Sequence, residues 1–266
     1  MERRTVSPDA AMPRFSGKRV VVKVGSSSVS GENASQIPNL VDSLARLHRA
    51  GTEVILVSSG AIATGVPFLL LGERPDDLAT QQAAAAVGQN ILVNRYQRSL
   101  TVHEIIAGQV LLTASDMQND THRSNAKRAL ERLLQLGILP IINENDTVAT
   151  HEIRFGDNDH LAALVAKLID ADQLVLLSDV DALYTAPPQQ PGATRISHVA
   201  YGDTLAGVEI GATQSGWGTG GAATKVQAAR LAADAGTAVL LTETRLLAGV
   251  LDGEPHGTHF EAAPRP

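Results

Sequence analysis

The stretch KRVVVKVG, residues 18–25, decides the kind of fold that this chain adopts. Valines dominate it and a glycine ends it, a pattern typical of a strand buried on both faces of a parallel sheet. The stretch TEVILVSSG, residues 52–60, has the same character. Residues 36–51 lie between the two and show helical spacing with a final glycine. We therefore predict that the fold begins with a strand, a helix and a second strand.

The same alternation continues through most of the chain. Further strands are expected at residues 107–113, 138–146, 172–185 and 237–242, and further helices at residues 78–100, 121–137, 158–170 and 222–236. Alternating strands and helices predict an α/β fold with a mostly parallel sheet covered by helices on both faces. Residues 185–215 are rich in proline, glycine and polar residues, and we expect a loop excursion or a small hairpin there.

Composition narrows the class of protein. The formal net charge is −6, with a pI of about 5.7, which argues against nucleic acid as a main partner. The absence of cysteine excludes disulfides and thiolate metal sites. No apolar stretch approaches the roughly 18 residues of a membrane span. Residues 1–17 lack the apolar core of a signal peptide and are expected to be a disordered leader, residues 261–266 form a tail, and the expected location is the cytoplasm.

Polar residues follow four of the predicted strands. The strand ends read KVGSSS, VSSGA, NEND and SDVD. In open parallel sheets, ligands bind beyond the carboxyl ends of the strands. Together with the motif GDND at residues 156–159 and a glycine-rich loop, these clusters predict one site assembled from separate loops.

Each cluster allows a simpler interpretation as well. Lys23 lies in an apolar strand, where an unpaired lysine is costly to bury. It either faces a phosphate, with donors from the glycine and serines that follow, or marks a strand edge that reaches water. Ser59 and Gly60 fit a ligand contact or a plain turn. One polar residue suffices to cap the helix that begins near residue 158, so capping does not account for the whole GDND and NEND set.

The glycine-rich stretch GWGTGGAATKVQAARLAADAG, residues 216–236, suggests a phosphate site. It is not a P-loop, because Thr224 and not glycine precedes Lys225. Its G-x-G-x-x-G spacing follows a polar, broken segment in place of the buried strand that a dinucleotide fingerprint requires. Glycine N–H groups ahead of a helix can hold an anion, and a surface loop would have the same composition.

Taken together, the motifs resemble those of the glutamate 5-kinase family of the amino acid kinase superfamily. The resemblance rests on VVVKVGSSSVSG, VILVSSGAIATG, AAVGQ, RSNAKRAL, ILPIINENDTVAT, FGDNDHLAALVAKL, LLSDVDALYT and GTGGAATKVQAA, and it covers about residues 18–260. It implies an amino acid kinase domain folded as a three-layer α/β/α sandwich. Many bacterial members carry an additional C-terminal PUA domain, which this chain is expected to lack.

The resemblance also implies an activity. Members of the family use ATP, with Mg²⁺ bound mainly through the ATP phosphates, to phosphorylate the γ-carboxylate of L-glutamate. The product is L-glutamyl 5-phosphate, the first intermediate of proline biosynthesis. L-Proline is then a candidate feedback inhibitor, and a homo-oligomer is expected. Two alternatives stay open at this point: another kinase of the superfamily, acting on N-acetylglutamate, carbamate or UMP, or a non-catalytic ligand-sensing module.

Site residues follow by matching motif to motif. The catalytic candidates are Lys23, Asp159 and Lys225. The ATP-binding candidates are Lys23, Gly25, Ser26, Ser178, Asp179, Thr219, Gly220, Gly221, Ala222, Ala223, Thr224 and Lys225. The glutamate-binding candidates are Ser59, Gly60, Asn143, Asp146, Asp157 and Asn158.

Three positions depart from the family pattern. Ala222 replaces a usual methionine, Ala182 a usual glycine, and Arg154 a common lysine.

Overall fold

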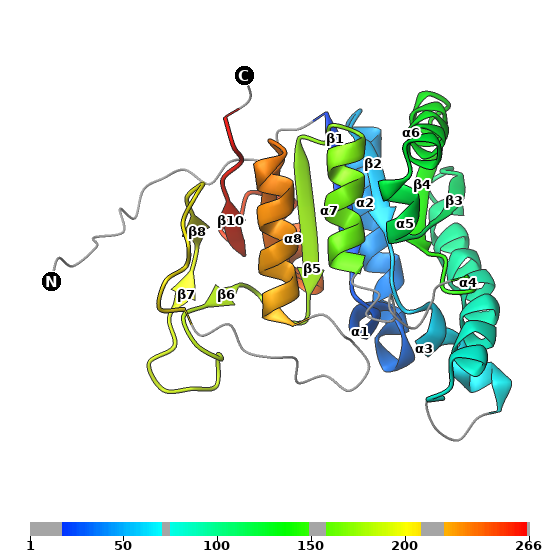
Figure 1. Cartoon of the computed structure of the whole chain (residues 1–266), viewed down its shortest axis with the longest axis horizontal. Coiled ribbons are helices and arrows are strands. Elements are labelled where there is room, and N and C mark those ends of the chain that lie inside the picture. The colour runs from blue at the N-terminus through cyan, green and yellow to red at the C-terminus, as the bar shows by residue number, and fades with distance from the viewer. Residues whose placement is uncertain (1–17, 71–74, 149–157, 209–220, 265–266) are drawn as a thin grey trace, which may run out of the picture.

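The computed structural model describes residues 18–70, 75–148, 158–208 and 221–264. Within these residues an eight-stranded sheet has the order β3-β4-β2-β1-β5-β9-β10-β8 (Figure 1). Its strands are β1 (Arg19–Val24), β2 (Glu53–Val57), β3 (Ala107–Leu112), β4 (Leu139–Glu144), β5 (Gln173–Ser178), β8 (His198–Val199), β9 (Ala238–Glu243) and β10 (Thr258–Phe260). All pairs from β3 to β9 are parallel, whereas β10 is antiparallel to β9.

Helices cover both faces of the sheet (Figure 1). The α-helices are α1 (Ser26–Val29), α2 (Ile37–Arg49), α3 (Ala61–Gly65), α4 (Leu78–Thr101), α5 (Ala114–Gln118), α6 (Asp120–Gln135), α7 (Asn158–Leu168), α8 (Ala222–Asp234) and α9 (Leu247–Leu251). The described residues also contain the short 3₁₀ helices η1 (Gly31–Gln36), η2 (Val66–Leu69) and η4 (Thr244–Leu246). Among the described helices, none is long and apolar enough to cross a membrane.

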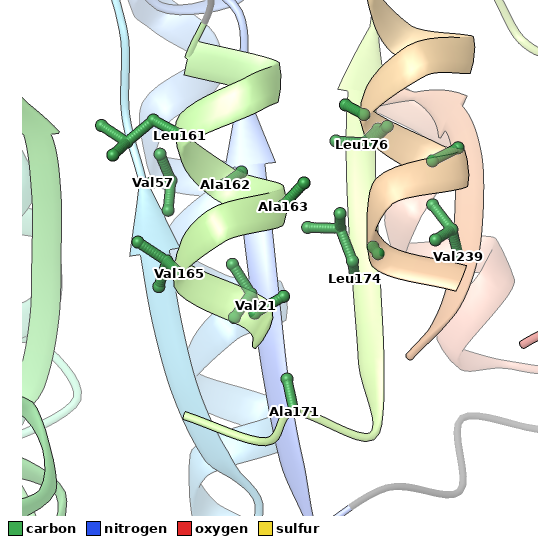
Figure 2. Close-up of a cluster of buried hydrophobic side chains, with 14 of the residues drawn as sticks. Val21, Val57, Leu161, Ala162, Ala163, Val165, Ala171, Leu174, Leu176 and Val239 are labelled. Atoms are coloured by element: carbon green, nitrogen blue, oxygen red, sulfur yellow. The ribbon is translucent and has the colours of Figure 1, made fainter. Parts of the chain in front are cut away.

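The sheet separates two apolar cores, and the twofold period of a strand decides which side chain enters which core. Val21 of β1 packs into the core under α6, α7 and α8, where Figure 2 shows it beside Val165. Val20 and Val22 enter the opposite core with α2 and α4. Because both faces of β1 are covered, its side chains at residues 20–22 are fully buried, as the valine run predicts.

The α/β/α architecture and the six main strands are confirmed. Besides β5, the region of the predicted strand at residues 172–185 contains a second short strand, β6 (Leu183–Tyr184). It pairs antiparallel with β7 (Arg195–Ile196), which lies in the expected excursion. The sequence pattern missed β8 and β10, which are too short to show a period. The predicted leader at residues 1–17 lies outside the described residues.

Two glycines bring α3 into backbone contact with α4. A Cβ on Gly65 would lie 1.9 Å from the carbonyl oxygen of Ala84, and a Cβ on Gly88 would lie 1.8 Å from that of Ala61. Real Cβ atoms do not approach a backbone oxygen so closely, so the two helices touch only because both side chains are absent. This crossing seats α3, and with it the end of β2, against α4.

The close contact between α3 and α4 predicts the sign of the change in stability that one substitution causes. At an uncrowded helix position, glycine to alanine stabilises by up to about 1 kcal/mol. Gly88→Ala should instead lower the free energy of unfolding by about 2 kcal/mol or more, because a backbone must shift. Urea denaturation measures the change. Ala86→Ser, at an exposed position of the same helix, is the control and should change stability by no more than about 0.5 kcal/mol. A stabilising Gly88→Ala would contradict the close crossing.

Candidate active site

The four predicted polar clusters follow strands that are neighbours in the sheet. β4, β2, β1 and β5 are consecutive and parallel. Their carboxyl ends therefore lie at one edge, and so do the loops that begin there. The structure thus brings together segments that are far apart in the sequence.

At the centre of this edge, one carboxylate binds two lysines. Asp159 Oδ1 lies 2.5 Å from Lys23 Nζ, and Asp159 Oδ2 lies 3.1 Å from Lys225 Nζ. Lys23 follows Val21 on the face of β1 that is covered by α7 and α8, which is why it reaches a side chain on each helix. Thr224 Oγ1 also donates to Asp159 Oδ2, at 3.3 Å.

All three charged side chains are buried. Asp159 is fully buried, and Lys23 and Lys225 are 5% and 8% exposed. Burial alone would raise the pKa of the Asp159 carboxyl, but the two neighbouring ammonium groups outweigh burial and lower that pKa to about 2. Asp159 is therefore ionised at neutral pH, and the three groups together carry a formal charge of +1.

Backbone donors flank the lysines. Gly25 precedes α1, and a Cβ there would lie 3.9 Å from Lys23 Nζ. Gly221 precedes α8, whose first turn contains no acidic residue. Helix N-termini present unpaired N–H groups and partial positive charge. The other predicted loop members Ala222, Ala223 and Thr224 form the first turn of α8, whereas Thr219 and Gly220 lie outside the described residues.

A second group of predicted residues meets where β2 ends. Asn158 Nδ2 donates to Ser59 Oγ at 3.0 Å and thereby joins α7 to the β2–α3 loop. Gly60 has a φ of +89°, which favours glycine, and a Cβ there would lie 3.4 Å from Ser26 Cα. The loop predicted to bind glutamate thus packs on the loop predicted to bind ATP. Asp157 lies outside the described residues.

Two acceptors on this side lack partners in the described part of the chain. Asn158 Oδ1 is buried without a hydrogen bond. Asp146 is half-buried just beyond β4, and no hydrogen bond or ion pair of its side chain is found among the described residues. Burial raises the pKa of Asp146 to about 6. At neutral pH, Asp146 is therefore an ionised carboxylate in a place where ionisation is costly.

The remaining predicted site residues lie near the carboxyl ends of β5 and β4. Ser178 Oγ donates to Asp179 Oδ1 at 3.1 Å at the end of β5. Asn143, in contrast, has its side-chain amide bonded within the protein: Nδ2 donates to Gln89 Oε1, and Oδ1 accepts from the backbone N–H of Glu144. Gln89 is the last residue of the motif AAVGQ, residues 85–89, but the resemblance assigned it no role.

Two of the three positions that depart from the family pattern lie within the described residues. Ala182 is buried and is not among the residues of positive φ in the described chain, so its backbone needs no glycine. Ala222 begins α8 at a half-buried position. Arg154 lies outside the described residues.

Comparison with known proteins shows which family this chain belongs to. Residues 18–242 match the model of the amino acid kinase family. The chain is 71% identical to a glutamate 5-kinase of Leifsonia xyli subsp. xyli, over 93% of this chain and 92% of that protein. This chain belongs to the glutamate 5-kinase family.

Other relatives agree. A glutamate 5-kinase of Clavibacter michiganensis is 68% identical, over 94% of this chain and 96% of that protein. One from Salinispora arenicola is 56% identical, over 93% of this chain but 69% of its own length. A carbamate kinase from Giardia lamblia bound to AMP-PNP has the same fold, with a TM-score of 0.66 at 15% identity, over 93% of this chain and 99% of that chain.

The raised pKa of Asp146 predicts a stability effect in the ligand-free protein. A folded-state pKa of about 6, above the ordinary value, means that stability is lost as the pH rises through that value. Asp146→Asn should therefore raise the melting temperature at pH 7.5, and the difference should shrink towards pH 5. Differential scanning fluorimetry at both pH values measures it. Glu32→Gln, at an exposed position, is the control, and an Asp146→Asn melting temperature at or below that of the wild type at pH 7.5 would refute the assignment.

Proposed function

We propose that this protein transfers the γ-phosphoryl group of ATP to the γ-carboxylate of L-glutamate, giving L-glutamyl 5-phosphate and ADP. This reaction is the first step of proline biosynthesis. The observation that carries the proposal is the buried set of Lys23, Asp159 and Lys225 at the strand edge of a glutamate 5-kinase family member. The 71% identity to a glutamate 5-kinase favours this activity over a superfamily kinase with another substrate.

Charge explains why the reaction needs two lysines. The attacking carboxylate and the γ-phosphate are both anions, and phosphoryl transfer requires positioning and charge neutralisation more than covalent chemistry. We assign Lys23 and Lys225 to the transferred phosphate, with Asp159 holding both ammonium groups in place. Donors fixed before the reaction need no reorganisation in the transition state. No general base is required, because the glutamate carboxylate is ionised at neutral pH.

The donor set fits Mg²⁺ carried by ATP. Asp159 is engaged with both lysines, and no three His, Asp or Glu side chains of the described chain gather as a metal site. We therefore propose that the ion is held chiefly by phosphate oxygens, where it would neutralise part of the phosphate charge. The chain's own contribution is to place the lysines and the backbone donors at Gly25, Ser26 and Gly221 around those phosphates.

The other side of the edge suits the amino acid end of glutamate. An α-ammonium group needs acceptors, and the carboxylate of Asp146 and the buried Oδ1 of Asn158 are acceptors without partners among the described residues. Pairing with an ammonium group would offset the cost of ionising Asp146. We assign Ser59, Asn158 and Asp146 to the substrate, with Gly60 shaping the loop and Asp157 beside them in sequence.

The remaining assignments concern the nucleotide and the setting. We propose that Ser178 and Asp179 contact ATP, and that residues 219–225 enclose its phosphates. ATP and glutamate are metabolites of the cytoplasm, which is where we place the protein. A homo-oligomer remains a prediction from the resemblance, and the lack of a nucleic-acid partner remains a prediction from the negative net charge.

One assay tests the activity and its specificity. ADP release should depend on L-glutamate and should be absent with N-acetylglutamate, carbamate or UMP. ADP release with one of those three acceptors in place of glutamate would assign the protein to another kinase activity. A lack of turnover with every acceptor would indicate a sensing module.

Removing one lysine should affect turnover more than glutamate binding. Lys225→Ala should lower kcat by roughly 10²–10³-fold, as for loss of one donor to the transition state, with the KM for glutamate nearly unchanged. Steady-state kinetics measure both constants. Lys167→Ala, which removes an exposed lysine of α7, should leave them unchanged. Turnover of Lys225→Ala close to that of the wild type would mean that Lys225 is only structural.

Proline should compete with glutamate. It shares the α-carboxylate and the α-nitrogen of glutamate, so the pocket portion built by Ser59, Asp146 and Asn158 can accept either ligand. We propose that L-proline inhibits this protein competitively, with inhibition that weakens as glutamate rises. Initial rates over a grid of both concentrations test this. Rates unaffected by saturating proline at low glutamate would refute it, and inhibition that persists at high glutamate would require a separate site.

A further inference from the structure

β4 continues for two residues, Asn143 and Glu144, beyond its last pair with β2. Ser58 N–H donates to the carbonyl of Ile142 at 2.8 Å, whereas Asn145 N–H donates to Leu112 at 2.9 Å on the other side. Even-numbered residues of β4 thus direct their backbone groups towards β2, and odd-numbered residues towards β3. The pairing of β2 with β4 ends at Val57 and Ile142. The backbone groups of Glu144 therefore point towards β2 at a position where β2 no longer pairs with β4.

Two side-chain amides take the place of β2. Gln89 Nε2 donates to the carbonyl of Glu144 at 3.1 Å, and Asn143 Oδ1 accepts from the N–H of Glu144 at 2.9 Å. The two amides also bind each other, since Asn143 Nδ2 donates to Gln89 Oε1 at 3.2 Å. Asn143 reaches Gln89 because it follows Ile141 on the face of β4 that packs against α4.

This arrangement is fully enclosed. Gln89, Asn143 and Glu144 are 6%, 3% and 6% exposed. Buried backbone groups that lose their partners cost more free energy than the bonds themselves contribute. Only a side chain with both a donor and an acceptor can serve Glu144 and Asn143 together, which an amide provides and a carboxylate or thioether does not.

We propose that Gln89 is a positioning residue for the glutamate pocket, an inference that rests on the proposed function. By completing the hydrogen bonding of β4 it holds the turn that carries Asp146. Because Gln89 binds the carbonyl of Glu144 in place of β2, Ser59 and Gly60 need not continue the strand and can turn towards Asn158. Asn143 then acts through the same pair of amides, and its side chain positions the turn without contacting the substrate.

The chain offers a matched control on the same helix. Gln97 lies eight residues further along α4, and its amide also binds backbone: Nε2 donates to the carbonyl of Ile105, just before β3, and Oε1 accepts from the N–H of Ala107. Those bonds lie at the start of β3, at the opposite edge from the site. Methionine keeps the length and flexibility of glutamine while removing its donor and acceptor.

Steady-state kinetics should separate the two variants. Gln89→Met should raise the KM for glutamate by roughly tenfold or more, as for unpaired buried polar groups. Its kcat and its KM for ATP should stay within about threefold of the wild type, because the lysines are untouched. Gln97→Met should change none of these constants. Equal KM values for glutamate in both variants, or a loss confined to kcat, would overturn the proposal.

A second measurement does not depend on the substrate. Hydrogen exchange of the peptide spanning residues 139–148 should be faster in Gln89→Met than in Gln97→Met, at Asn145 and Asp146 above all. If the wild type releases no ADP with glutamate, the proposed function fails, and exchange still decides whether Gln89 holds the end of β4. Unchanged exchange would overturn the proposal.

A further variant covers a failure to fold. Gln89→Glu keeps an acceptor for Asn143 and loses the donor to Glu144, so it should also raise the KM for glutamate and speed exchange at Asn145. If neither Gln89 variant folds while Gln97→Met does, Gln89 is required for folding, and the proposed positioning role is overturned.

Discussion

The site depends on one electrostatic constraint, the burial of two lysines with a single shared carboxylate. An unpaired ammonium group is far too costly to bury, so Lys23 and Lys225 can occupy the interior only because Asp159 lies between them. The three residues come from β1, α7 and α8. The same contacts that pair the lysines therefore fix two helices against the central strand, so the fold and the geometry that we assign to catalysis are stabilised together.

The opposite half of the site is organised by α4. Gly88 lets α3 approach the helix backbone, Gln89 binds the end of β4, and the hydroxyl of buried Tyr96 hydrogen-bonds Ser58 at the end of β2. Burial raises the pKa of Tyr96, which keeps that hydroxyl protonated. One long helix thus sets the positions of the two loops that we assign to glutamate, while the lysine-bearing elements form the side that we assign to phosphate.

These two halves differ in how they hold polar groups. On the side that we assign to phosphate, the charged groups are paired in the free protein, so the donors are in place before ATP binds. On the side that we assign to glutamate, Asp146 and Asn158 Oδ1 have no partner among the described residues. Unpaired acceptors reduce the stability of the free protein and increase the gain from binding an ammonium group. This is the usual compromise between stability and function at a binding site.

The sequence by itself determined the α/β class, the six main strands and the polar clusters at their ends, because strand and helix periods are local properties of the chain. It also pointed to Lys23 as an anomaly among valines. It could not determine the strand order, the short strands β8 and β10, the α3–α4 contact or the role of Gln89. Each of these depends on partners distant in sequence: Gln89 and Glu144, for example, are 55 residues apart. Only the tertiary structure shows that the pairing of β2 with β4 ends before Glu144, so that side-chain amides bind the backbone of this residue.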